Sequence, residues 1–309
     1  MGDPAFLQIK AIMSTPEAIQ QSLEFLTRHM GAFLRPQEKI LICFPDDGEG
    51  SIGDLLTRAA RKLGAIPVPL DGDYRWKTML KTSFSSRISA IAGPPLTILG
   101  LTKLSKATKT PLYFRHVITA GYPCLDWMID GIRQGSDCQT WCCYGPGSGT
   151  VLVGISCGKS RGVHIRDDMF TIHIEDEKGN ALPEGSIGDI VISPKSDPSI
   201  RFHTLERGRL DSSTCSCGQL SPRLFDFDYG WQVDEILREL WAELMSWTSI
   251  LDCDLIRGEN GLELEIVTFP REKLPRFPSC ARQVVRPWDP ERDSPFWFQR
   301  GWRKTLENG

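Results

Sequence analysis

Apolar stretches of strand length alternate with helical patterns along the first half of the chain. A helix is predicted from Thr15, which is suited to cap it, with Pro16 at its first position and Gly31 at its end. Within this segment apolar residues recur at helical spacing, namely Ile19, Leu23, Leu26 and Met30. The segment is therefore predicted to be an amphipathic helix with its apolar face in the core.

Five apolar strands and four more helices are predicted to follow in strict alternation. The predicted strands are residues 39–44, 65–70, 88–95, 115–121 and 138–145, and the predicted helices are residues 55–65, 74–84, 97–107 and 123–135. Short apolar strands separated by helices of this length are typical of a parallel, layered α/β sheet. In such sheets ligands bind beyond the carboxyl ends of the strands.

The pattern changes at about residue 150. Alternating apolar and polar positions with turn signals between them predict antiparallel strands over residues 151–157, 162–176, 186–193 and 200–210. The last part holds a predicted helix, two predicted strands and an aromatic, proline-rich tail. We therefore divide the chain into an α/β core (1–150), a β-rich subdomain (151–226) and a reduced C-terminal part with the tail (227–309).

Composition and charge exclude some partners. The 309 residues are 40% hydrophobic and 24% charged, with a formal net charge of −3, which is ordinary for a globular protein. No basic stripe predicts nucleic-acid binding, and no apolar run is long enough to cross a membrane. The N-terminal residues lack a signal-peptide pattern. We therefore expect a cytoplasmic protein without a nucleic-acid or membrane partner.

Four cysteine and histidine residues form a candidate metal site. The chain has ten cysteines, and without secretion a disulfide framework is not expected. Cys157 ends one predicted strand and His164 begins the next, while Cys215 and Cys217 form a C-x-C knuckle. Three thiolates and an imidazole suit tetrahedral zinc. The alternative is that these thiols are simply buried, as is expected for most of the other cysteines.

The sequence YGPGSGT at residues 144–150 is rich in glycine, as phosphate-binding loops are. It follows a predicted strand, at the edge where a parallel sheet binds its ligands. Its three glycines fit a phosphate cradle, but they also fit a tight turn that leaves the strand. Composition alone leaves both interpretations open.

Several segments match one known family in the same order. They are residues 38–44, 55–73, 117–123, 141–149, 162–193 and 200–224, which include the patterns GVHIRDD, LPEGSIGDIVI and TCSCG. On these segments the chain resembles the adenylate-forming ligases, specifically the phenylacetate–coenzyme A ligase branch. Those enzymes activate a carboxylate with ATP to an acyl-adenylate and transfer the acyl group to coenzyme A. The resemblance implies an α/β core with a layered, mostly parallel sheet, a β-rich subdomain and an abridged C-terminal α+β lid.

The resemblance also implies positions for the ligands of this family. The residual nucleotide-binding residues that it implies are Tyr122, Tyr144, Gly145, Ser148, Glu206 and Arg209. Glu206 stands where the family has an Asp that binds the ribose hydroxyls, and Tyr122 stands beside the adenine. Asp71, Gly72 and Asp73 border the implied acyl pocket. Relatives with a comparable Cys/His set add weight to a structural zinc.

Three catalytic elements of the family are not matched. Its phosphate-binding loop would precede the helix at Thr15, and no such loop is found there. Ser148 replaces the Glu that helps to hold magnesium, and a hard cation prefers carboxylate. Cys280 falls where the catalytic lysine is expected, and a thiol does not supply the charge of an ammonium group. Without these groups the transition state of adenylation loses its main electrostatic stabilisation.

Three hypotheses about function follow. In the first, the protein has lost adenylation and binds a small carboxylate, acyl group or nucleotide (AMP or ATP) in a regulatory or accessory role. In the second, it is an active carboxylate–coenzyme A ligase in which a protein partner supplies the missing loop. In the third, it is a scaffold that binds a protein partner through its aromatic tail. Binding of coenzyme A is left open.

Overall fold

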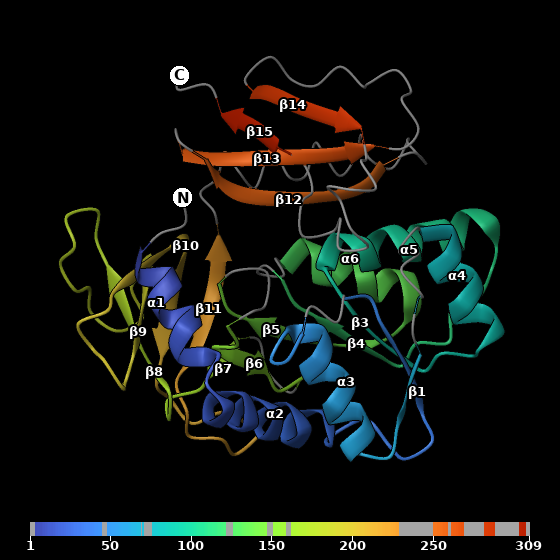
Figure 1. Ribbon diagram of the computed structural model, residues 1–309, viewed down its shortest axis with the longest axis horizontal. Coiled ribbons are helices and arrows are strands. Elements are labelled where there is room, and N and C mark those ends of the chain that lie inside the picture. Colours follow the sequence, from blue (N-terminus) through green and yellow to red (C-terminus); the bar gives the residue numbers. More distant parts are fainter. Residues whose placement is uncertain are drawn as a thin grey trace.

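The computed structural model of the 309-residue chain (Figure 1) describes most of the first 228 residues and four later strands. The described residues are 4–44, 48–68, 70, 76–121, 126–146, 151–158, 162–228, 250–258, 261–268, 281–287 and 303–306.

The first half forms a parallel sheet covered by helices, as predicted. Its strands are β1 (Lys39–Ile42), β2 (Ile66–Val68), β3 (Ala90–Gly93), β4 (His116–Thr119) and β5 (Gln139–Tyr144). They pair in parallel in the order β2-β1-β3-β4-β5. A doubly wound sheet with this order changes direction between its first and third strands, which divides the covering helices between its two faces.

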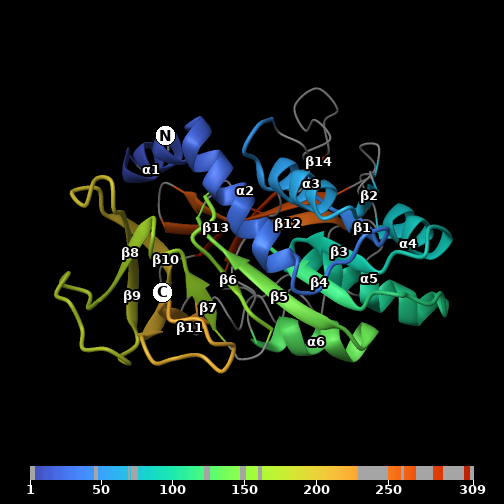
Figure 2. The same cartoon turned by 90° about the horizontal axis from the view of Figure 1, so that it is seen from below.

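Each pair of consecutive parallel strands is joined by a helix. The connecting helices are α3 (Ile52–Lys62), α4 (Trp76–Ser85), α5 (Pro95–Thr108) and α6 (Asp126–Ser136), and α2 (Pro16–Met30) precedes β1. Figure 2 shows α2 and α3 on one face of the sheet and α5 and α6 on the other. All the helices and strands predicted up to residue 145 are therefore confirmed, with ends that differ by a few residues.

Helix α2 begins and ends at the predicted residues. The Thr15 side chain accepts a hydrogen bond from the Ala18 amide at 3.3 Å, which satisfies one of the unpaired donors of the first turn. Gly31 ends the helix in a right-handed conformation, at φ −62°. A preceding helix, α1 (Pro4–Met13), was not predicted, and it buries Ile9 and Met13.

The β-rich part continues the same sheet with antiparallel strands. They are β6 (Gly154–Ser156), β7 (Val163–Ile165), β8 (Phe170–Glu175), β9 (Gly188–Pro194), β10 (Phe202–Asp211) and β11 (Arg223–Asp228). Strand β5 pairs with β6, and the described strands run on in the order β6-β7-β11-β10-β9-β8. The antiparallel strands predicted here are confirmed, and β11 is an additional one. The division into three domains stays a prediction.

Two hydrophobic clusters hold these parts together. One lies between the parallel strands and helices α2 and α3, where Phe33 stacks on Trp141 with ring centroids 3.9 Å apart. The other lies between α1 and the antiparallel strands, and it includes Tyr144. The end of β5 therefore lies where the two clusters meet.

The C-terminal part contains a second sheet. Its strands are β12 (Ile250–Gly258), β13 (Gly261–Thr268), β14 (Ala281–Pro287) and β15 (Arg303–Leu306). The antiparallel pair β12–β13 confirms the strands predicted after residue 250. The predicted helix at 233–246 and most of the aromatic tail lie outside the described residues. Within the described part of the chain, no helix combines the length and the apolar character that a membrane span requires.

Candidate functional site

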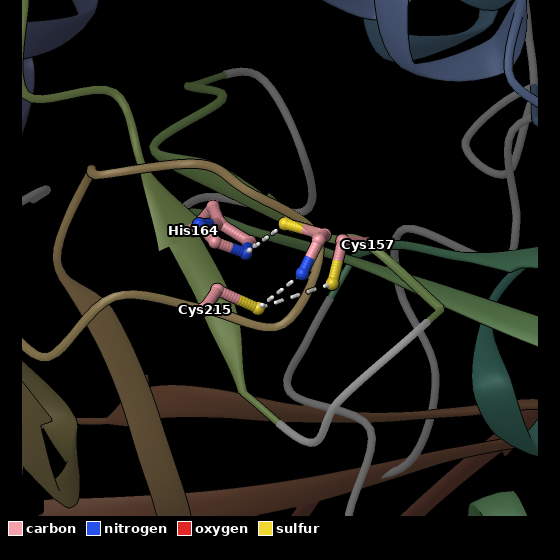
Figure 3. Close-up of side chains that lie close together, drawn as sticks. Cys157, His164 and Cys215 are labelled. Atoms are coloured by element: carbon pink, nitrogen blue, oxygen red, sulfur yellow. Dashed lines mark hydrogen bonds between the residues drawn. The ribbon is translucent and has the colours of Figure 1, made fainter.

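Strand pairing brings the four predicted metal ligands together. Cys157 directly follows β6, and His164 lies on β7, which pairs antiparallel with β6. Strand β11 pairs with the other edge of β7, and the loop before β11 carries Cys215 and Cys217. Figure 3 shows the side chains of Cys157, His164 and Cys215 pointing toward one another. Residues separated by up to 60 positions thus form one cluster.

The four candidate ligand atoms lie within 4.8 Å of one another. The sulfur atoms of Cys157 and Cys215 are 3.8 Å apart, and the Cys217 sulfur lies 3.4 Å from Nε2 of His164. Tetrahedral zinc, with bonds of about 2.3 Å to sulfur and about 2.0 Å to nitrogen, places two sulfurs about 3.8 Å apart and sulfur and nitrogen about 3.5 Å apart. The cluster therefore has the donor types and spacings of a four-coordinate metal site and can hold a metal ion.

A further contact orients the histidine for this role. Nδ1 of His164 lies 3.1 Å from the Ser221 hydroxyl oxygen, which leaves Nε2 to face the Cys217 sulfur. Metal-bound histidines usually make such a hydrogen bond through the second ring nitrogen, which fixes the ring orientation. His164 is only 1% exposed, so its ring is also held by packing.

The C-x-C knuckle is a tight turn closed by backbone hydrogen bonds. The Gly218 amide donates to the Cys215 carbonyl at 2.9 Å, and the Cys215 amide donates to the Gln219 carbonyl at 3.3 Å. Gly218 has φ +88°, a conformation that favours glycine. The Cys217 amide also donates to the Cys215 sulfur at 3.5 Å. This turn points both cysteine side chains of the knuckle to one side, as the sequence hypothesis requires.

Burial and neighbouring thiols raise the pKa of Cys217 to about 11, with burial the larger cause. The thiol is therefore protonated at neutral pH when no metal is bound. Because a metal binds the thiolate, binding has to release this proton. Occupation of the cluster is thus favoured at neutral and alkaline pH over acidic pH.

The other described cysteines lie outside this cluster. Burial raises the pKa of the Cys43 and Cys143 thiols far above the ordinary value, and both side chains are almost fully buried. Cys43, Cys138, Cys142 and Cys143 form no disulfide. Cys43 and Cys143 therefore act as small apolar residues of the core.

Two of the predicted nucleotide-binding residues lie in contact. The Tyr144 hydroxyl, at the end of β5, is 3.5 Å from a carboxylate oxygen of Glu206, where β10 is irregular. The Glu206 amide donates to the Thr204 hydroxyl oxygen at 3.2 Å. Tyr144 is 3% exposed, and burial and the Glu206 carboxylate raise its pKa. The phenol is therefore neutral and suited to donate a hydrogen bond.

Gly145 and Arg209 have packing roles beside this pair. A Cβ atom added to Gly145 would lie 1.7 Å from the Val151 carbonyl oxygen, so the backbone approaches there too closely for any side chain. The guanidinium carbon of Arg209 lies 4.8 Å from the centre of the Phe225 ring, a favourable cation–π contact. Gly145 is thus required for the turn that leaves β5, whether or not a nucleotide binds.

Six further residues of the sequence hypothesis lie outside the described residues. They are Asp71, Gly72, Asp73, Tyr122, Ser148 and Cys280. The acyl pocket, the magnesium position and the lysine position therefore stay predictions.

Sequence reasoning missed Ser221, which contacts His164, and Arg166, a buried arginine two residues beyond His164. Both lie within segments that matched the family pattern, but nothing in their spacing indicated a role. Their contacts join residues that are far apart in the sequence, so a local pattern does not reveal them.

Comparison with known proteins supports the fold. No family model and no curated protein matches the sequence. The structure of a 2-hydroxyisobutyryl-CoA ligase in complex with 2-HIB-AMP and CoA matches with a TM-score of 0.58 at 15% identity, over 81% of this chain and 58% of that one. The anthranilate CoA ligase AuaEII in complex with anthranoyl-AMP matches with a TM-score of 0.51 at 11% identity, over 82% and 54%.

A third match is the amide bond synthetase McbA from Marinactinospora thermotolerans, with a TM-score of 0.50 at 14% identity, over 82% of this chain and 57% of that one. The chain thus spans less than three fifths of the length of these enzymes. None of the three is named for phenylacetate, so that branch stays a prediction. The fold of the chain is that of the adenylate-forming ligases.

Proposed function

We propose that this chain binds a small carboxylate, acyl group or adenine nucleotide and does not form an acyl-adenylate. The observation that carries the proposal is the contact between Tyr144 and Glu206 within this fold. The contact places a carboxylate and a phenol at the end of β5, where the chain leaves the parallel part of the sheet. We therefore assign the protein a regulatory or accessory role.

The Glu206 side chain supports nucleotide binding. Its carboxylate offers acceptors for two ribose hydroxyls, and hydrogen bonds to a charged acceptor contribute about 1.5–3 kcal/mol each. The half-buried position of Glu206 strengthens such bonds because competing water is reduced. The Tyr144 hydroxyl holds the carboxylate from the protein side.

Two sequence positions support the loss of adenylation. Ser148 and Cys280 stand where the resemblance implies a magnesium-binding carboxylate and a catalytic ammonium group. Each replacement removes charge that would stabilise the transition state, and every 1.4 kcal/mol lost slows a reaction about tenfold. Because both groups are replaced, we expect this chain to form an acyl-adenylate too slowly to act as a ligase.

The Cys/His cluster is assigned to structural zinc. The four donors Cys157, His164, Cys215 and Cys217 complete a tetrahedral set, which leaves no open position for a substrate or water. Closed sites of this kind stabilise a fold and take no part in the reaction. Bound zinc would tie β6, β7 and the 215–217 knuckle to one another.

Calorimetry with AMP, ATP and phenylacetate tests the ligand proposal. We expect saturable binding of AMP or ATP, and we expect Glu206→Ala to weaken it at least about tenfold because two hydrogen bonds are lost. Glu177→Ala, which removes an exposed carboxylate elsewhere, is the matched control and should bind like the wild type.

Other results favour the competing hypotheses. No binding of any of the three compounds contradicts the proposal and favours a scaffold. Release of pyrophosphate from ATP that depends on the acid contradicts the loss of adenylation and favours an active ligase.

A further inference from the structure

The positive charges of the chain are unevenly distributed. Residues 74–125 contain eight lysines and arginines and no aspartate or glutamate, so the net charge of −3 combines +8 in this segment with −11 elsewhere. The segment includes α4, β3, α5 and β4. Figures 1 and 2 show α4 and α5 side by side, at the opposite end of the molecule from β8 and β9. Folding therefore gathers these charges in one part of the molecule.

The ends of α4 and α5 lie at the same edge of the parallel sheet. Helix α4 leads into β3 and helix α5 leads into β4, and these two strands are parallel neighbours. The two connecting loops are in contact, because the Arg115 amide donates to the Ser89 carbonyl at 2.8 Å. This edge holds the amino ends of the strands, whereas Tyr144 lies at the carboxyl end of β5. The edge is therefore separate from the proposed nucleotide site.

Two aromatic side chains are exposed at this edge. Phe84, at the end of α4, is 45% exposed, and Tyr113, in the loop after α5, is 41% exposed. Their rings stack with centroids 6.2 Å apart, and the Arg87 guanidinium carbon lies 6.0 Å from the centre of the Tyr113 ring. These contacts hold the two rings in place before a partner binds, which lowers the entropy cost of forming an interface.

Four exposed cations accompany the aromatic pair. On α4, Lys81 lies one turn before Phe84, and Arg87 follows the end of the helix. On α5, Lys106 lies in the last turn, and Lys109 caps the helix. Among the residues that the structure describes, no carboxylate forms an ion pair with any of the four. A helix dipole favours cations at these positions, but it does not account for the lack of acidic side chains beside them.

The charges and the aromatic pair together define the kind of partner. A surface of one sign favours a partner of the opposite sign and steers its approach. Protein interfaces are enriched in aromatic residues and arginine, whereas single-stranded nucleic acid stacks its bases on free aromatic faces. Here the Tyr113 ring is already contacted by Phe84 and Arg87. An acidic protein segment with apolar side chains therefore fits this surface better than nucleic acid does.

We propose that an acidic segment of a protein partner binds the exposed surface at the ends of α4 and α5. This surface consists of Lys81, Phe84, Arg87, Lys106, Lys109 and Tyr113. Carboxylates of the segment face the four cations, and an apolar side chain of the segment packs on the two aromatic rings. The surface is independent of the nucleotide site, so either proposal can fail without the other.

Fluorescence anisotropy of the full chain with labelled peptides tests the proposal. The probe alternates glutamate with phenylalanine, one control peptide has glutamine in place of glutamate, and a second control has serine in place of phenylalanine. We expect the probe to bind with a dissociation constant below about 100 μM and each control to bind at least about tenfold more weakly. Raising the ionic strength from about 0.05 M to about 0.5 M should weaken binding of the probe, because salt screens exposed charges. No saturable binding of the probe, or equal binding of either control, overturns the proposal.

Two variants assign the binding to this surface. Lys81→Glu reverses one exposed charge and Phe84→Ser removes one exposed ring, and each should weaken binding of the probe at least about fivefold. Lys178→Glu makes the same charge change in the exposed turn between β8 and β9 and should bind like the wild type. Unchanged binding by Lys81→Glu and Phe84→Ser, or equal weakening by Lys178→Glu, contradicts the assigned surface. An oligouridine that displaces the probe more strongly than unlabelled peptide does would assign the surface to nucleic acid instead.

Discussion

The Cys215→Ser variant is expected to bind no zinc and to unfold at a much lower temperature than the wild-type protein. Cys215 is 3% exposed, and its sulfur lies 3.8 Å from that of Cys157. Structural zinc contributes apparent binding free energies of about 10–16 kcal/mol in small zinc domains. Even about 4 kcal/mol of this would lower the melting temperature of a domain this large by about 10 °C.

Metal analysis and thermal unfolding measure the two effects together. The wild-type protein should contain one zinc ion per chain and the variant none. Cys138→Ser, which changes a buried cysteine outside the cluster, should keep the zinc. Wild-type protein purified without metal, with an unfolding temperature that zinc does not raise, would show that the four residues are simply buried thiols.

Gly145→Ala is expected to destabilise the fold by more than about 4 kcal/mol, which is an exceptional effect for a single methyl group. The added Cβ would lie 1.7 Å from the Val151 carbonyl oxygen, and two backbone segments would have to move apart to admit it. The Tyr144 carbonyl accepts a hydrogen bond from the Val153 amide at 2.8 Å, so this movement also breaks the pairing beyond β5.

Chemical denaturation with Gly31→Ala as the control measures this effect. Gly31 has ordinary helical φ, and its nearest contact to an added Cβ is 3.1 Å, so we expect a change below about 1 kcal/mol. If Gly145→Ala is as stable as the wild type but binds AMP more weakly, this prediction is wrong. Gly145 would then be needed to let the ligand approach the backbone and not to form the turn.

The alternating elements of the first half were predictable because each carries its own local signal. Thr15, Pro16 and the apolar face of α2 specify that helix without reference to the rest of the chain. Helix α1 is apolar almost throughout, with Gln8 and Lys10 as its only polar residues, so its sequence shows no clear apolar stripe, and its Ile9 and Met13 are buried by packing on the antiparallel strands. Short helices are stabilised mainly by such tertiary contacts, which sequence patterns do not show.

The Cys/His cluster and the contact between Tyr144 and Glu206 were predictable from the sequence to different extents. The Cys215–Cys217 knuckle and Cys157 were recognisable because few other functions need thiols at such spacing. Glu206 was identified only through a family resemblance, and its contact with Tyr144 depends on the irregular pairing of β10. The buried charge of Arg166 follows from packing against α2, which lies more than a hundred residues earlier in the sequence.

The most direct test of the central claim is an assay for pyrophosphate release by the purified chain with ATP, magnesium and phenylacetate or another aryl acid. The account predicts AMP or ATP binding with no pyrophosphate release above the background without acid. Release that depends on the acid and is abolished by Glu206→Ala would contradict it, because the chain would then adenylate a carboxylate despite Ser148 and Cys280.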